Sequence, residues 1–324
     1  ALGFASLASL LAGIGVFVLL SALYVLLMYR GVSQHHDLQA LLREDADQAV
    51  LNANPQDREE ISLLRERLLQ SIERLQGSSK GGANKDALYA LPWYLVIGQP
   101  ASGKSTMLYQ SGLTFPYAER EGARVAGLGG TRNCDWFFSS EAVLLDTAGR
   151  YMNNQEEAGK WRAFLGLLRQ HRQRRPLNGL IVAVSIEDIL HAGADGRERL
   201  AKRLRERIQE AHELLELRLP IYLVFTKCDL LPGFTHFYRQ LDAHLRDEVM
   251  GKTFSHEGFE QSDWGTRFAA AMNELVGHWQ ALADHQLLQQ DIQLTRRDPA
   301  AYRLPLELAA LKPLLNAFCL LYTS

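Results

Sequence analysis

The residues with the clearest chemistry lie at positions 98–105, which read Gly-Gln-Pro-Ala-Ser-Gly-Lys-Ser. This is a complete phosphate-binding loop pattern, and it follows an apolar run at 93–97, as the motif requires. Glycines let backbone N–H groups approach a phosphate closely. Lys104 is placed to contact the β- and γ-phosphates, and Ser105 to ligate Mg²⁺. A glycine turn beside a solvated lysine is the alternative interpretation. The expected phosphate-site residues are Gly98, Gln99, Pro100, Ala101, Ser102, Gly103, Lys104, Ser105 and Thr106.

A second phosphate-handling motif, Asp-Thr-Ala-Gly, occupies residues 146–149 directly after an apolar run. A carboxylate at the end of a strand can hold Mg²⁺ through a water, so Asp146 is a predicted metal residue. Gly149 can offer its N–H to the γ-phosphate, and such a loop senses hydrolysis. Thr131 is expected to complete the Mg²⁺ coordination from the connecting segment, with Thr114 as the competing candidate.

Arg150 follows Gly149, at the position where many GTPases have a glutamine that orients the attacking water. A guanidinium has no acceptor, so it cannot act as a base. It could stabilise γ-phosphate charge in cis, or bond only to a phosphate or to a partner's carboxylate. We therefore expect intact nucleotide binding with slow intrinsic hydrolysis, raised by assembly.

A base-reading motif is predicted at residues 226–229, Thr-Lys-Cys-Asp, which follow the apolar run 220–225. Asp229 is expected to accept hydrogen bonds from guanine, while the stem of Lys227 covers the base plane. Thr226 stands where asparagine is usual and lacks the amide that ties this loop to the phosphate loop. ATP therefore remains an alternative to GTP, and a simple turn at a strand end is the alternative to a site.

The elements that must position these motifs predict an α/β fold. Apolar runs predict strands at 93–97, 180–184 and 220–225, and residues 136–145 predict a hairpin. We expect a GTPase-like P-loop NTPase domain over 86–318, with a mostly parallel sheet flanked by helices. The other expected elements are a crossover helix at 197–217, a solvated helix end at the arginines of 169–175, surface helices at 235–250 and 263–290, a short strand at 301–304, a helix at 305–318 and a tail at 319–324. A contact with a protein or a lipid is the alternative interpretation of these arginines.

The first 29 residues contain no charged side chain. About 20 apolar residues span a bilayer, so residues 1–30 are predicted to form a transmembrane helix, with a buried soluble helix as the alternative. Residues 31–85 are expected to form a cytoplasmic helical stalk that ends in a Gly/Ser hinge. Its apolar face could pack on the domain or on a partner. The chain opens at Ala1 without an initiator methionine, so we expect it to be part of a longer protein.

Net charge and cysteine content bear on the partners and the compartment of the chain. The formal net charge of −2 provides no field that would draw the protein to nucleic acid. Cys134, Cys228 and Cys319 lack metal or redox spacing and are expected to be reduced thiols in the cytosol.

Four segments together resemble the IcmF/TssM family: G-Q-P-A-S-G-K-S, G-G-T-R-N-C-D-W-F-F running into L-L-D-T-A-G-R-Y, T-K-C-D, and P-L-E-L-A-A-L-K-P-L. The resemblance implies an inner-membrane core component of type VI secretion, with residues after about 30 in the cytoplasm. It also implies partners: the inner-membrane protein TssL, baseplate proteins, further copies of the same chain, and the outer-membrane lipoprotein TssJ. The periplasmic part that binds TssJ is absent from this sequence.

Three interpretations of function follow. The chain could be an NTPase whose cycle switches the loops at 114–132 and 147–154, or a scaffold in which turnover is dispensable. A membrane-anchored signalling GTPase unrelated to secretion is the third. Recovery of TssL with the chain purified from membranes would favour secretion over signalling.

Overall fold

A computed structural model describes residues 58–77, 87–115, 134–152, 157–254, 264–292 and 303–323. The chain divides into two compact units, residues 1–65 and 66–324, and the sheet lies in the second. The predicted membrane helix and the first helical pattern predicted for the stalk, over 37–52, lie outside the described residues. Of the hinge predicted at 77–82, only Gly77 is described, as the last residue of α2. Within the described ranges, no helix combines the length and apolar character needed to cross a membrane.

The centre of the second unit is a sheet of five strands in the order β2-β3-β1-β4-β5. β2 pairs with β3 in antiparallel fashion, and the other neighbouring pairs are parallel. Leu95 of β1 lies opposite Leu145 on one side and Leu180 on the other, which makes a continuous apolar layer. The predicted mostly parallel sheet and hairpin are therefore confirmed. The strands are β1 Trp93–Ile97, β2 Cys134–Phe138, β3 Val143–Thr147, β4 Gly179–Ser185 and β5 Ile221–Thr226.

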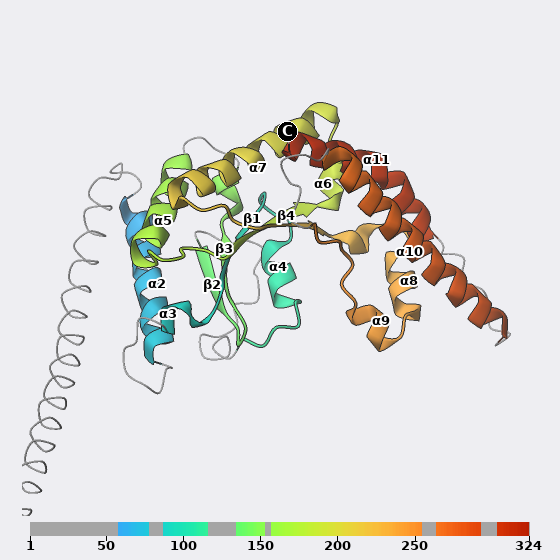
Figure 1. The fold of residues 1–324 in the computed structure, drawn as a ribbon, viewed down its shortest axis with the longest axis horizontal. Helices are drawn as coiled ribbons and strands as arrows, with labels where there is room; N and C mark the ends of the chain where they lie inside the picture. The colour runs from blue at the N-terminus through green and yellow to red at the C-terminus, as the bar shows by residue number, and fades with distance from the viewer. Residues whose placement is uncertain are drawn as a thin grey trace, which may run out of the picture. The chain divides into compact units, whose positions relative to one another are not determined.

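Helices cover both faces of the sheet (Figure 1). On one face α4 contributes Leu108 to a core cluster that includes Val96 and Phe137. The other face carries α5 and α7, which pack on each other, and α11 packs on α7 and α10. The helices are α2 Arg58–Gly77, α3 Ala87–Ala90, α4 Lys104–Tyr109, α5 Ala158–His171, α6 Ile186–His191, α7 Ala194–Leu215, α8 Phe234–Gln240, α9 Ala243–Asp247, α10 Trp264–Ile292 and α11 Arg303–Thr323, with 3-10 turns η2 Gly149–Met152 and η3 Cys228–Leu230.

Two predictions for the C-terminal part are wrong. The helix expected over 235–250 is broken into α8 and α9, because Leu241 leaves the helical conformation between them. The strand expected at 301–304 is replaced at Arg303 by the start of α11. Pro305 suits the first turn of a helix, where its missing N–H has no intrahelical partner. α11 then continues to Thr323, through most of the predicted tail.

The arginine run at 169–175 is not uniformly solvated as predicted. Arg172 is 1% exposed and lies at the end of α5. Its guanidinium donates to the carbonyl oxygens of Arg175, Pro176 and Leu91 and to Oδ1 of Asn178. It also lies over the rings of Tyr89 and Trp93. Arg172 therefore connects the end of α5 to the start of β1 through these contacts.

Candidate nucleotide site

The predicted site residues gather at one edge of the sheet. The phosphate loop follows β1, the Asp-Thr-Ala-Gly motif includes the end of β3, and the Thr-Lys-Cys-Asp motif begins at the end of β5. β4, between β1 and β5, runs directly into α6. Because β1, β3, β4 and β5 are parallel, their carboxyl ends meet at the same edge, where α/β proteins bind ligands.

The phosphate loop has a backbone that explains its glycines. A Cβ on Gly98 would lie 2.3 Å from the carbonyl oxygen of Ala183, so no larger residue fits beside β4. Ala101 and Gly103 have φ values of 59° and 81°, in the left-handed region that favours glycine. Successive residues of opposite handedness turn backbone N–H groups to the same side, which is the usual anion-binding geometry of such loops.

Lys104 is buried inside this loop, at 6% exposure. Its Nζ donates to the carbonyl oxygens of Gly98 and Gln99, at 3.1 and 3.0 Å. Burial lowers the pKa of Lys104, while the nearby Asp146 carboxylate acts in the opposite direction. A buried cation bonded only to neutral carbonyls is expensive, so a further anion beside it would be favourable.

Ser105 and Asp146, the two predicted Mg²⁺ residues, meet in the structure. The Ser105 hydroxyl donates to Oδ2 of Asp146, whose side chain is fully buried. Hydroxyl and carboxylate oxygens are ligands that Mg²⁺ prefers, and this ion usually needs only one or two of them beside phosphates and waters. The pair therefore fits a Mg²⁺ site. Thr131 lies outside the described residues, and Thr114 is exposed beyond α4.

Gly149 lies directly against the phosphate loop. A Cβ there would be 2.3 Å from the backbone N of Pro100 and 2.7 Å from the carbonyl carbon of Gln99. Arg150, in contrast, forms an ion pair with Glu157, with Nε and Oε2 3.3 Å apart. The predicted role of Arg150 at the γ-phosphate remains a prediction.

Thr226 ties the Thr-Lys-Cys-Asp loop to the phosphate loop. Its hydroxyl donates to the carbonyl oxygen of Ser102 at 2.5 Å and lies 3.3 Å from that of Val184. The connection that an asparagine amide would make is thus made here by a threonine hydroxyl. The stem of Lys227 runs beside Gly103, where an added Cβ would be 3.9 Å from its Cγ. Asp229 is exposed in η3.

Glu187 is a candidate site residue that the sequence analysis did not identify. Its Oε2 accepts from Nζ of Lys227 at 2.9 Å, and this hydrogen bond lowers the pKa of the Glu187 carboxyl. Glu187 lies in the first turn of α6. The only signal in the sequence was an acidic pair, Glu187-Asp188, directly after a buried strand.

A cavity of about 550 Å³ adjoins the phosphate loop. Two carboxylates line it, and an acidic lining disfavours a phosphate. The cavity is therefore less suited to a phosphate than the loop beside Lys104 is. The cavity is lined by Gln99, Glu187, Asp188, His191, Ala192, Gly196 and Leu200.

Replacing Thr226 with valine is expected to lower the free energy of unfolding by about 1–2 kcal/mol. Valine keeps the shape but leaves the buried carbonyl oxygens of Ser102 and Val184 without the hydroxyl. Thr226→Ser, which keeps the hydroxyl, should lose less than half as much. Urea unfolding of both variants measures the difference; equal losses would show that packing, and not the hydrogen bond, matters at this position.

The comparisons with known proteins place the chain in a family. The IcmF-related N-terminal domain matches residues 154–322, which is more than half of the chain. The chain belongs to the IcmF-related family. This confirms the resemblance to IcmF/TssM proteins. The match begins just before α5, so the phosphate loop and Asp146 precede it.

An IcmF-related relative shows how much of a longer protein the chain represents. The chain is 40% identical over 270 residues to the type VI secretion system component TssM1 of Pseudomonas aeruginosa. The alignment covers 80% of this chain and 24% of that protein. The chain therefore spans about a quarter of the length of this relative.

Proposed function

We propose that this chain is the nucleotide-binding part of a type VI secretion system component in the bacterial inner membrane. In this proposal the residues after about 30 are cytoplasmic. The site binds GTP or ATP with Mg²⁺ and hydrolyses it slowly, and the nucleotide state switches or anchors the secretion complex. The similarity to TssM1 supports a role in type VI secretion. The geometry around Lys104, Ser105 and Asp146 supports the binding of a nucleotide with Mg²⁺.

The observation that carries the nucleotide proposal is the state of Lys104. The sequence motif alone is compatible with a solvated lysine, but the structure buries this cation within the loop. Ser105 and Asp146 come together beside it from separate elements. A buried lysine, a hydroxyl and a carboxylate are the protein groups that hold a triphosphate and its Mg²⁺ in P-loop proteins.

The roles of the other groups follow from their positions. Backbone N–H groups of the phosphate loop bind phosphate oxygens, and the N–H of Gly149 approaches the γ-phosphate from the other side. Asp229 reads the base and the Lys227 stem covers it. Arg150, which has no acceptor and cannot act as a base, pairs with Glu157, and this supports slow hydrolysis.

The proposed partners rest on the family and not on the geometry. They are a TssL-like inner-membrane protein, baseplate proteins on the cytoplasmic side, further copies of the chain, and a TssJ-like lipoprotein bound by a periplasmic region outside this sequence. The scaffold hypothesis stays as the second candidate, because an arginine engaged with Glu157 is equally compatible with a site that binds nucleotide without turnover.

A nucleotide titration tests the proposal. The chain, purified in mild detergent, is titrated with a fluorescent GTP analogue with and without Mg²⁺, and the probe is displaced with GTP, ATP or GDP. We expect micromolar binding that requires Mg²⁺. Absence of binding at millimolar nucleotide would refute the nucleotide proposal and favour the scaffold.

The Asp229→Asn variant tests base recognition in the same assay. Asparagine presents an N–H to the guanine donors, so the preference for GTP over ATP is expected to fall by roughly tenfold to a hundredfold. Asp195→Asn, an exposed aspartate in the first turn of α7, is the control and should change nothing. An unchanged GTP preference in Asp229→Asn would remove this residue from the site.

A further inference from the structure

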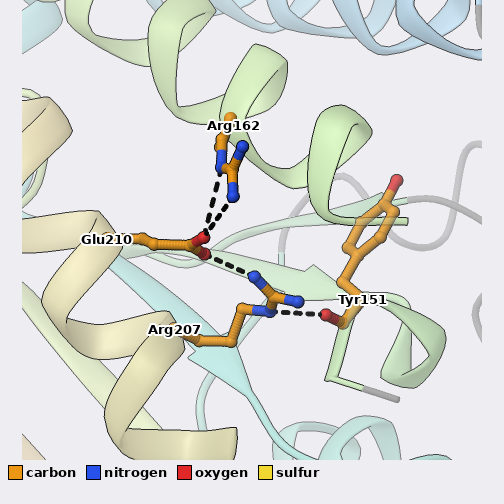
Figure 2. A network of polar contacts seen from close by, with 4 residues as sticks. All are labelled: Tyr151, Arg162, Arg207 and Glu210. Atoms are coloured by element: carbon orange, nitrogen blue, oxygen red, sulfur yellow. Dashed lines mark hydrogen bonds and ion pairs between the residues drawn. The ribbon is translucent and has the colours of Figure 1, made fainter. Parts of the chain in front are cut away.

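A buried arginine holds the segment that follows Gly149. Arg207 lies on α7 at 7% exposure, and its Nε donates to the carbonyl oxygen of Tyr151 at 2.8 Å. Tyr151 is fully buried in η2, two residues after Gly149. Figure 2 shows the guanidinium of Arg207 reaching this carbonyl from the helix. The contact is to the backbone, so it restrains the path of the chain and not one side chain.

Arg207 is itself held by two helices. Its Nη1 donates to Oε2 of Glu210, one turn further along α7. The other carboxylate oxygen of Glu210 accepts from Nε and Nη2 of Arg162 on α5, at 3.2 and 3.1 Å (Figure 2). Because α5 and α7 pack on each other, the Tyr151 carbonyl is fixed relative to the helix layer on that face of the sheet.

The segment held in this way is the one that touches the phosphate loop. Gly149 lies so close to Pro100 and Gln99 that no Cβ fits between them. The segment is therefore restrained at Gly149 by the phosphate loop and at Tyr151 by Arg207. The guanidinium that compensates the buried carbonyl oxygen of Tyr151 therefore also sets the path of the chain two residues after Gly149.

We propose that Arg207 is a positioning residue of the nucleotide site: it fixes the segment 149–152 so that the N–H of Gly149 is presented to the γ-phosphate. The assignment of the γ-phosphate rests on the proposed function. Without Arg207, this segment has to be ordered at the moment of binding, at the entropic cost of fixing free backbone. That cost falls on a triphosphate, which contacts Gly149, and not on a diphosphate, which lacks the group that Gly149 meets.

The coupling also works in the opposite direction. If Arg207 favours the arrangement that binds a γ-phosphate, then a bound γ-phosphate favours the network of Arg207, Glu210 and Arg162 by the same factor. The packing of α5 on α7, and of α7 on α11, thereby becomes sensitive to the nucleotide state. Hydrolysis thereby reaches the surface of the helix layer through Arg207, Glu210 and Arg162.

Two substitutions whose side chains have similar length distinguish the effect of the lost hydrogen bond from that of lost packing. Arg207→Met has no donor where Nε stands, whereas Arg207→Gln keeps an N–H at the equivalent place along the side chain. In the full chain, Arg207→Met is expected to weaken a non-hydrolysable GTP analogue about tenfold and GDP less than about twofold. Arg207→Gln should recover most of the loss. Arg205→Met, an exposed arginine of the same helix, is the matched control. Equal weakening of GDP and the GTP analogue, or none, would overturn the inference.

Hydrogen exchange measured without nucleotide tests whether Arg207 restrains residues 149–152, independently of the proposed function. The amides of residues 149–152 are expected to exchange faster in Arg207→Met than in the original chain or in Arg207→Gln, by more than the change in global stability measured by urea unfolding accounts for. If the original chain binds no nucleotide, the proposed function fails, and exchange still decides whether Arg207 restrains the segment. Unchanged exchange would overturn the inference even if nucleotide binds. Should Arg207→Met fail to fold, Arg162→Met, at an exposed position, should shift exchange in the same direction by less.

Discussion

Replacing Lys104 with alanine is expected to weaken the binding of a nucleoside triphosphate by at least about a hundredfold. The ammonium is already desolvated within the phosphate loop, so it faces a phosphate at low local dielectric. Each charge-assisted hydrogen bond to an anion contributes about 1.5–3 kcal/mol, and the lysine can provide two of them, to the β- and γ-phosphates. Alanine removes both.

Competition titration and thermal shift measure this loss. Adding GTP with Mg²⁺ should raise the melting temperature of the original chain, and Lys104→Ala should need about a hundredfold more GTP for the same rise, because ligand stabilisation depends on the ratio of ligand concentration to Kd. Lys202→Ala, an exposed lysine of α7, is the matched control and should bind as the original chain does. Equal affinity in Lys104→Ala would mean that any nucleotide binds somewhere else on the chain.

Replacing Arg172 with methionine is expected to lower the free energy of unfolding by about 2–4 kcal/mol. The carbonyl oxygens of Leu91, Arg175 and Pro176 lose their donor, and two of the rings around the guanidinium lose a cation–π contact. Burial lowers the pKa of Arg172 to about 10, so the buried charge is itself unfavourable. Methionine removes the cost of burying that charge. We therefore expect the loss in the free energy of unfolding to be smaller than the sum of the contributions of the lost contacts.

Arg169→Met is the matched control for this prediction. Arg169 lies three residues earlier in α5 and pairs with Glu216 at the surface, with both side chains well exposed. Exposed ion pairs contribute up to about 1 kcal/mol, so a smaller loss is expected. Urea unfolding of the two variants gives both values. A loss in Arg172→Met no larger than in Arg169→Met would show that Arg172 does not hold α5 to the sheet.

The strands and the loops at their carboxyl ends were predictable from the sequence. Runs such as 180–184 and 220–225 are short and apolar and end in polar residues, which predicts buried strands. β4 is buried along most of its length, whereas β5, at the end of the strand order, leaves Ile221 and Tyr222 exposed, so the prediction of burial is wrong for β5. The phosphate loop needed no tertiary information either, because its pattern specifies its own turn. Only the end of α5, at the arginine run, was predicted to be helical, although Trp161, Phe164, Leu165 and Leu168 recur at helical spacing.

The partners of these charged side chains were not predictable. Lys227 meets Glu187 from 40 residues away, Arg207 meets Tyr151 across 56, and Arg172 meets Leu91 across 81. Nothing in the local pattern distinguishes Arg172 from Arg174 or Arg175, yet only the first of these three is buried. Whether an arginine side chain is exposed to solvent or buried depends on which backbone carbonyls the rest of the chain brings close to it.

The sequence by itself determined the family, the mostly parallel sheet and the residue types at its carboxyl edge, because strand propensity, turn glycines and motif spacing are local properties. Only the tertiary structure decided that Thr226 joins the two loops, that Arg150 pairs with Glu157, and that Arg207 holds the segment after Gly149. The physical reason is that the cost of burying a polar group, and the group that compensates for it, are set by residues distant in the chain.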